Sequence, residues 1–158
     1  MPVTPTYVAL GTVILSGASA SVTFSSIPAT YRDLIIVMTG STSNTTNPRV
    51  QFNGDTGNGS YVYMLGTGSS TGSGANTDAA LVGGLANGVQ QSMIIQVMDY
   101  SATDKHKTIL SRSNSTSEPV WAFASRWAST AAVNQVRLLN QAGTNFNSGS
   151  TFSLFGIA

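Results

Sequence analysis

Hydrophobic and polar positions alternate along much of this chain, and the alternation predicts β-strands separated by polar turns. From Ala20 to Ser25 every second residue is apolar, the period of two typical of a strand with one buried face. Pro28 ends that pattern, because proline lacks a backbone N–H. Leu34–Met38 is then an unbroken apolar run, which predicts a strand covered on both faces, by a second sheet and, as a hypothesis, by another subunit. A change from a half-buried to a fully buried strand is expected where a β-sandwich chain passes between its sheets.

The rest of the chain repeats this pattern and predicts about nine short strands in all. The other predicted strands are Tyr7–Leu15, Arg49–Phe52, Tyr61–Leu65, Val89–Met98, Lys105–Arg112, Trp121–Trp127, Val136–Leu139 and Ser150–Ile157. No segment has the period of an amphipathic helix, although Ser129–Gln135 could form one helical turn. The predicted fold is all-β, an antiparallel, jelly-roll-like β-sandwich over residues 7–158 preceded by an extended N-terminal arm at residues 1–6. The last strand carries apolar residues on both faces, which predicts a central position in a sheet.

Two glycine-rich segments raise the question of bound ions. Asn53-Gly54 predicts a hairpin turn. The oxygen atoms of the following Asp55–Gly59 suggest a calcium site, but the segment lacks the other carboxylates and the final Glu of an EF-hand loop. A plain turn is therefore the preferred interpretation. Gly66–Thr77 resembles a phosphate-binding loop only in its glycines. No Lys-Ser/Thr follows it, and a flexible loop is expected. We therefore predict neither a metal nor a cofactor.

Composition narrows the classes of function. The chain has 158 residues, of which 41% are hydrophobic but only 8% are charged, against about 25% in typical soluble proteins. Its net charge of +1 provides no electrostatic basis for binding nucleic acid or an anionic membrane. There is no cysteine, no basic segment typical of a signal peptide and no apolar stretch of about 18 residues. We expect synthesis in a cytoplasm, and a surface with so little charge favours packing in an assembly.

Groups suited to catalysis are scarce. The single histidine, His106, would need Asp99 or Asp104 and a serine to form a triad, and no GxSxG motif is present. Asp99 and Asp104 are the one close pair of acids, and both fall in a predicted turn, where aspartate is common. We predict no catalytic residue and no enzyme activity. Sugar binding stays open, because Tyr61, Tyr63 and Trp121 could stack on a sugar ring if they are not part of the core or of a subunit interface.

Several motifs resemble those of small virion proteins of tailed bacteriophages. That group shares an F-x-x-IP-x-x-Y-x-DL corner, an Asn-Gly-Asp…Tyr hairpin and a terminal G-S-x-x-x-L-[YF]-G-I. The matching residues here are Phe24, Ile27, Pro28, Tyr31, Asp33 and Leu34, then Asn53, Gly54, Asp55 and Tyr61, then Gly149, Ser150, Leu154, Phe155, Gly156 and Ile157. The resemblance extends over nearly the full chain, and its motifs are structural.

The resemblance implies a virion structural protein, usually a trimeric jelly roll. The expected role is a capsid decoration (cement) protein, made in the host bacterial cytoplasm, that forms a homotrimer and binds the major capsid protein on the surface of the head. The alternative is a tail-fibre or tail-tip module that binds a host surface glycan or protein. The sequence does not separate these two roles.

Overall fold

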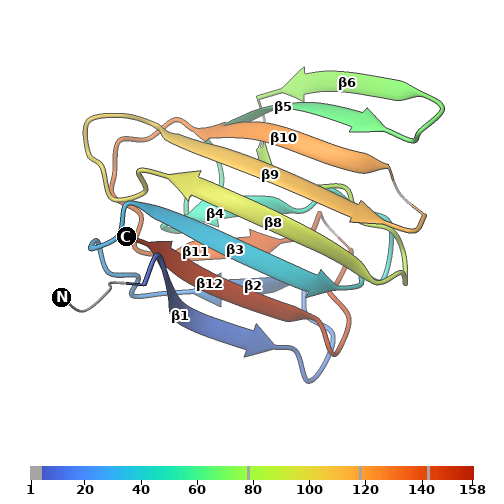
Figure 1. The fold of residues 1–158 in the computed structure, drawn as a ribbon, viewed down its shortest axis with the longest axis horizontal. Helices are drawn as coiled ribbons and strands as arrows, with labels where there is room; N and C mark the ends of the chain where they lie inside the picture. The colour runs from blue at the N-terminus through green and yellow to red at the C-terminus, as the bar shows by residue number, and fades with distance from the viewer. Residues whose placement is uncertain (1–4, 78, 118, 142) are drawn as a thin grey trace.

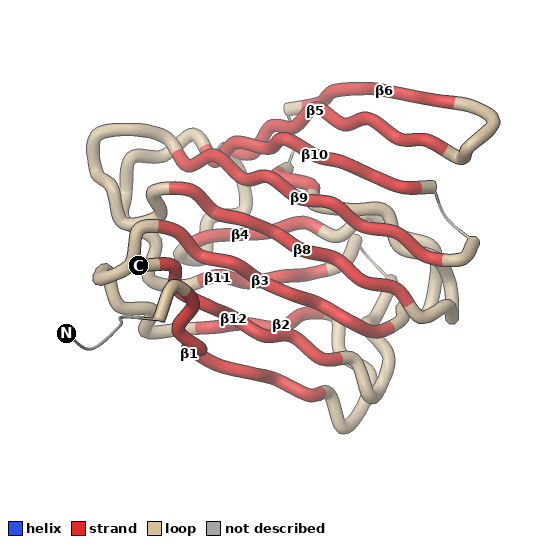
Figure 2. The backbone as a smooth tube through the Cα atoms, in the orientation of Figure 1, coloured by secondary structure: helices blue, strands red, loops and turns tan. Residues whose placement is uncertain are grey.

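The computed structural model describes residues 5–77, 79–117, 119–141 and 143–158, and these residues form strands and loops without a helix (Figure 2). The strands are β1 (Tyr7–Ile14), β2 (Ser21–Phe24), β3 (Asp33–Gly40), β4 (Arg49–Phe52), β5 (Gly59–Gly66), β6 (Thr71–Asn76), β7 (Ala80–Leu81), β8 (Gln91–Met98), β9 (Lys107–Ser115), β10 (Val120–Trp127), β11 (Val136–Leu139) and β12 (Thr151–Ile157). The predicted all-β class is confirmed.

The strands form two antiparallel sheets that make a jelly-roll-like sandwich. The large sheet has eight strands in the order β1-β12-β3-β8-β9-β10-β5-β6, and the small sheet has four in the order β2-β11-β4-β7. In Figure 1 the small sheet lies behind β12, β3 and β8, while the β5–β6 hairpin extends away from it. Since β2 belongs to the small sheet and β3 to the large one, the predicted change of sheet between them is confirmed.

The core lies between the two sheets and consists of the inward side of each strand. In β3 the inward side chains are Leu34, Ile36 and Met38, all at most 1% exposed. The small sheet contributes to the same cluster through the residues Val22, Phe24, Val50, Phe52, Val136 and Leu138. Complete burial of a large apolar side chain contributes about 1.5–3 kcal/mol, so this cluster is the main source of stability.

The first and last strands pair with each other at one side of the large sheet. β12 lies between β1 and β3, with Phe152 opposite Met38 and Val13, so the predicted central position of the last strand is confirmed. β1 is an edge strand, and its register shifts between Ala9 and Gly11. Such a bulge is a common protection of a sheet edge against pairing with other chains.

The corner between β2 and β3 is held by a buried tyrosine. Tyr100 is fully buried, and its hydroxyl donates a hydrogen bond to the Pro28 carbonyl and accepts one from the Tyr31 N–H at 3.4 Å. The Tyr31 ring lies against Gly156, where an added Cβ would come within 2.4 Å of the ring. The corner and the last strand, which carry two of the three sequence motifs, therefore touch in space.

Four sequence expectations were wrong, because contacts with other segments of the chain, and not local propensity, decided each structure. The expected flexible loop at Gly66–Thr77 contains strand β6, which pairs with β5; its Gly72 and Gly74 leave room for Leu65 and Tyr63. The short β7 was not predicted, and no helical turn forms at 129–135. The expected hairpin at Asn53-Gly54 is instead a connection between the sheets, since β4 and β5 belong to different ones. Of the predicted arm at residues 1–6, residues 1–4 lie outside the described chain.

Candidate interaction surface

The face of the large sheet that points away from the small sheet, here called the outer face, is covered by apolar side chains. Strand alternation places on it all seven exposed large hydrophobic residues of the described chain. They are Tyr7, Ile14, Val62, Met64, Met98, Leu110 and Val120. Scattered surface hydrophobics are ordinary, but their collection on one face is typical of an interaction site.

Cross-strand register places three of these residues, Val62, Met64 and Leu110, in two rows of outer-face side chains that run across the sheet. One row crosses all eight strands and has a single polar side chain, that of Gln96; its members are Ala75, Val62, Ala124, Leu110, Gln96, Ile35, Phe155 and Ala9. The next row contains Ser73, Met64, Ala122, Arg112, Ile94, Val37, Ser153 and Thr12. The apolar run Leu34–Met38 is thus covered by the small sheet on one side only. The cover predicted for its second face is not part of this chain's described residues.

A shallow hollow of about 410 Å³ lies in the middle of the outer face. Its side-chain lining is largely apolar and includes Ile35, Val62, Met64, Ile94 and Leu110. A second hollow adjoins it around Met64, Val120 and Ala122. The surface is therefore apolar and also shaped to receive a protruding group.

Charge divides the outer face into two halves. The outer residues of β1, β12, β3 and β8, here called the uncharged half, include no Lys, Arg or Glu and a single Asp, Asp33, which is 2% exposed. The outer residues of β9, β10, β5 and β6, the arginine half, include the exposed Arg112 and Arg126 and no acidic residue. The two arginines stand on either side of the row through Leu110 and Ala124. The two halves thus suit partners of different charge.

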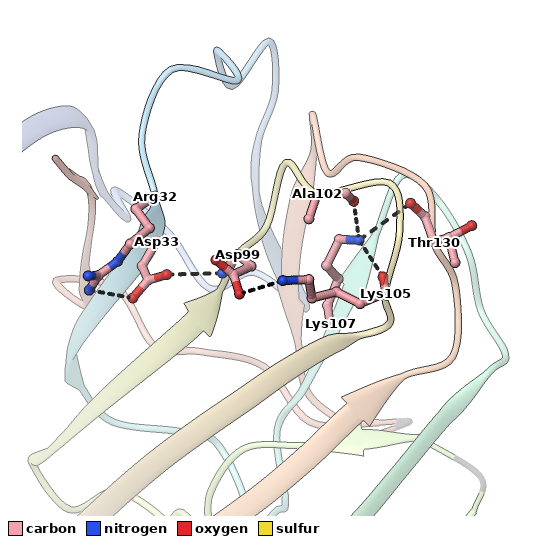
Figure 3. Close-up of polar contacts among 7 residues, drawn as sticks. All are labelled: Arg32, Asp33, Asp99, Ala102, Lys105, Lys107 and Thr130. Atoms are coloured by element: carbon pink, nitrogen blue, oxygen red, sulfur yellow. Dashed lines mark hydrogen bonds and ion pairs between the residues drawn. The ribbon is translucent and has the colours of Figure 1, made fainter.

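The acidic residues considered for catalysis hold loops together (Figure 3). Asp33 accepts hydrogen bonds from the Gln96 side chain at 2.9 Å and from the Asp99 backbone N–H at 3.0 Å. It also forms an ion pair with Arg32. Asp99 pairs at 3.3 Å with Lys105, and both side chains are about half exposed. Asp99 and Asp104 lie in the turn between β8 and β9, as predicted, and the ion pair of Asp99 with Lys105 is local to that turn.

His106 lies exposed just before β9, and no hydrogen bond joins it to a carboxylate within the described residues. The predicted strand over Lys105–Arg112 therefore begins two residues later, and the structure brings together no triad around His106 among the described residues. The same described residues contain no cluster of three His, Cys, Asp or Glu side chains that could hold a metal ion.

Sequence reasoning did not single out Lys107, the one fully buried cation among the described residues. Its Nζ donates hydrogen bonds to the carbonyl oxygens of Ala102 at 2.6 Å, Lys105 at 3.1 Å and Thr130 at 3.5 Å (Figure 3). Desolvation lowers the pKa of the Lys107 ammonium, and neighbouring Asp104 partly opposes that shift. The side chain ties the turn after β8 to the loop after β10, a structural role.

The aromatic residues considered for sugar binding lie on the inward side of β5 and β10 rather than on the outer face. Tyr61, Tyr63 and Trp121 are half-buried and pack with Phe123 at centroid distances of 5.5–5.9 Å. The Trp121 ring also lies against Gly84, and its buried Nε1 has no hydrogen-bond partner among the described residues. Most of their surface is used within the chain, although part of each ring stays accessible.

The Asp55 segment, considered above for calcium, is a hydrogen-bonded turn. Asp55 accepts bonds from Trp127 Nε1 at 2.7 Å, the Gly57 N–H at 2.9 Å and Asn58 Nδ2 at 3.0 Å. These bonds, of which that from Asn58 has the largest effect, hold the pKa of Asp55 below its usual range. Asn53, Gly54 and Asn58 all have positive φ, the conformation that asparagine and glycine tolerate best. The plain-turn interpretation accounts for every contact of the carboxylate.

No protein-family model matches this sequence, and a comparison with curated proteins gives no match. Among solved structures, the chain is similar to the galectin LEC-6 of Caenorhabditis elegans, with 10% identity, a TM-score of 0.38, and coverage of 90% of this chain and 94% of the galectin. The alginate lyase Aly36B has 9% identity and a TM-score of 0.35, covering 92% and 77%. The PL-14 alginate lyase of Aplysia kurodai has 11% identity and a TM-score of 0.34, covering 83% and 70%. Likeness at this level carries no argument about what the present chain binds.

The described residues include no helix long and apolar enough to cross a membrane.

Proposed function

We propose that this chain is a bacteriophage virion structural protein, a homotrimeric capsid decoration protein that binds the major capsid protein and stabilises the head. The observation that carries the proposal is the apolar outer face, which the described chain leaves uncovered. A protein that acts alone in solution gains nothing from such a face, whereas a component of an assembly buries it. The sequence motifs supply the virion context, and the role proposed is structural rather than catalytic.

The uncharged half of the outer face is the proposed contact between copies. It carries the exposed Tyr7, whose ring lies 6.4 Å from that of Phe155, together with the exposed Ile14 and the partly covered Val37. Apolar surface that lacks charge is typical of the centre of homo-oligomeric interfaces. Light scattering on the purified protein is expected to give a trimer, and a monomer at micromolar concentration would contradict this part of the proposal.

Mixing the purified protein with heads that lack it tests the role itself. We expect co-sedimentation with the heads, and decorated heads should withstand heating and osmotic shock better than undecorated ones. The number of copies per virion gives an independent measurement, since decoration of a lattice requires hundreds of copies. Failure to bind heads would refute the proposal.

The accessible parts of Tyr61, Tyr63 and Trp121 favour one alternative, a tail-tip module that binds a host surface glycan. That role requires binding to host cells and only a few to a few dozen copies in each virion. Loss of adsorption to host cells after a Tyr63→Ala substitution, with head stability unchanged, would favour it over decoration.

A further inference from the structure

We propose that the arginine half of the outer face binds a partner protein through an apolar ridge flanked by carboxylates. The inference rests on the proposed function in taking the major capsid protein as that partner. It goes further by naming the surface involved and the chemistry that the partner presents.

The apolar component follows from the exposed side chains of this half. Val62, Met64, Leu110 and Val120 are 43–67% exposed. The hollow of about 410 Å³ opens among the first three of them and reaches Ile94 and Ile35 on the neighbouring strands. Because a concave apolar surface is matched by a convex apolar one, the complementary shape is a ridge of hydrophobic side chains.

The charged component follows from Arg112 and Arg126. Both are exposed, and neither forms an ion pair or a hydrogen bond with another described residue. They lie on adjacent strands, with Arg112 opposite Ala122 and Arg126 opposite Thr108. From strand geometry their Cα atoms are roughly 14 Å apart, one on each side of the Leu110 row. A partner that covers this row must supply an acceptor near each guanidinium, and carboxylates are the acceptors that arginine pairs with most strongly.

The same charge distribution argues against a second copy as the occupant. Two arginine halves packed face to face would bury four guanidinium groups in one interface. The outer-face positions of these four strands contain no aspartate or glutamate to neutralise them. Like charges brought together in this way disfavour association, so this half selects a chemically different surface.

The area of the contact is consistent with attachment by several copies at once. From strand spacing and rise, the outer face measures roughly 900 Å², and the arginine half about half of that. A single copy therefore offers less than the roughly 800 Å² per partner of a standard interface. A trimer that presents three such halves to a repeating lattice exceeds that value and gains avidity from the linkage.

Charge reversal tests the inference. The double variant R112E/R126E is compared with R137E, a control that reverses an exposed arginine on β11 in the small sheet. Binding to heads assembled without the protein is measured by sedimentation at about 0.05 M and about 0.5 M NaCl, which changes the screening length severalfold. We expect R112E/R126E to bind roughly tenfold or more weakly at low salt. R137E should bind like the wild type, and wild-type binding should weaken as salt increases. R112K/R126K, which keeps both charges, should retain most of the binding.

The possible outcomes separate the two proposals. If the wild type does not bind heads, the proposed function is refuted and this inference with it. If the wild type binds and R112E/R126E binds equally well with the same salt dependence, the inference alone is refuted. If R112E/R126E changes the oligomeric state seen by light scattering, the arginine half is a contact between copies, which also overturns the inference.

Discussion

Phe152 and Phe155 allow the two faces of the large sheet to be compared by one substitution. Both lie in β12, but Phe152 points into the core and is 0% exposed, in an edge-to-face contact with Phe146 at 4.9 Å. Phe155 points to the outer face, where its neighbour is Tyr7 at 6.4 Å. A buried Phe→Ala change typically costs about 3–5 kcal/mol, because it removes apolar contacts and leaves a cavity. For the half-covered Phe155 the loss should be about 1–2 kcal/mol.

These values predict clearly different unfolding behaviour. At about 2–4 °C per kcal/mol for a chain of this size, Phe152→Ala should lower the melting temperature by roughly 6–20 °C, and Phe155→Ala by only a few degrees. Thermal and guanidinium unfolding of both variants would measure this, at several protein concentrations so that effects of assembly can be separated. Phe155→Ala should instead weaken self-association. Equal destabilisation by the two substitutions would refute the assignment of core and outer face.

Three further predictions concern the last strand, the Asp55 turn and metal dependence. Deletion of residues 151–158 removes the strand between β1 and β3 and should leave insoluble protein. Deletion of residues 1–4 should leave a soluble trimer. Expression followed by sedimentation would distinguish the insoluble variant from the soluble one. The folded-state pKa of Asp55 lies below its usual 3.8, so its stabilising effect is present above about pH 4 and is lost as pH falls through the folded-state value. Asp55→Asn should therefore reduce the acid dependence of unfolding, and Asp104→Asn should not. A chelator should leave the melting temperature unchanged, and an appreciable decrease would reopen the calcium interpretation.

The sequence was sufficient to predict strands whose own side chains carry a strong pattern. In β10 the large residues Trp121, Phe123 and Trp127 recur at every second or fourth position, as expected of a strand, and they share the face that points inward. By contrast, β6 has the composition of a flexible loop. It becomes a strand because β5 offers a complete set of pairing partners and large side chains that cover its glycines. That information lies in another segment, so local propensity could not reveal it.

The candidate surface was less predictable than the fold. The apolar run at Leu34–Met38 predicts a strand with two apolar faces, but the rows also depend on which strands are neighbours. Val62 on β5 and Phe155 on β12 belong to one row only because the four strands between them, β10, β9, β8 and β3, pair in the register that the structure has. Arg112 and Arg126 are unremarkable in the sequence for the same reason. They become part of a candidate interaction surface only because other strands place apolar residues around them.

The pairing of the first strand with the last has a consequence for folding during synthesis. Tyr7 pairs with Ile157, so β1 leaves the ribosome long before its only partner is made. At typical rates of about 5–20 residues per second, that interval is roughly 8–30 s. During this time both β1 and one edge of β3 lack the strand that later inserts between them. Nascent chains on one messenger RNA therefore hold the unpaired edges of β1 and β3 close together, and such strand edges can pair between chains. A chaperone that holds the nascent chain, or slow translation that spaces the ribosomes, should raise the soluble yield more than a change of growth medium does.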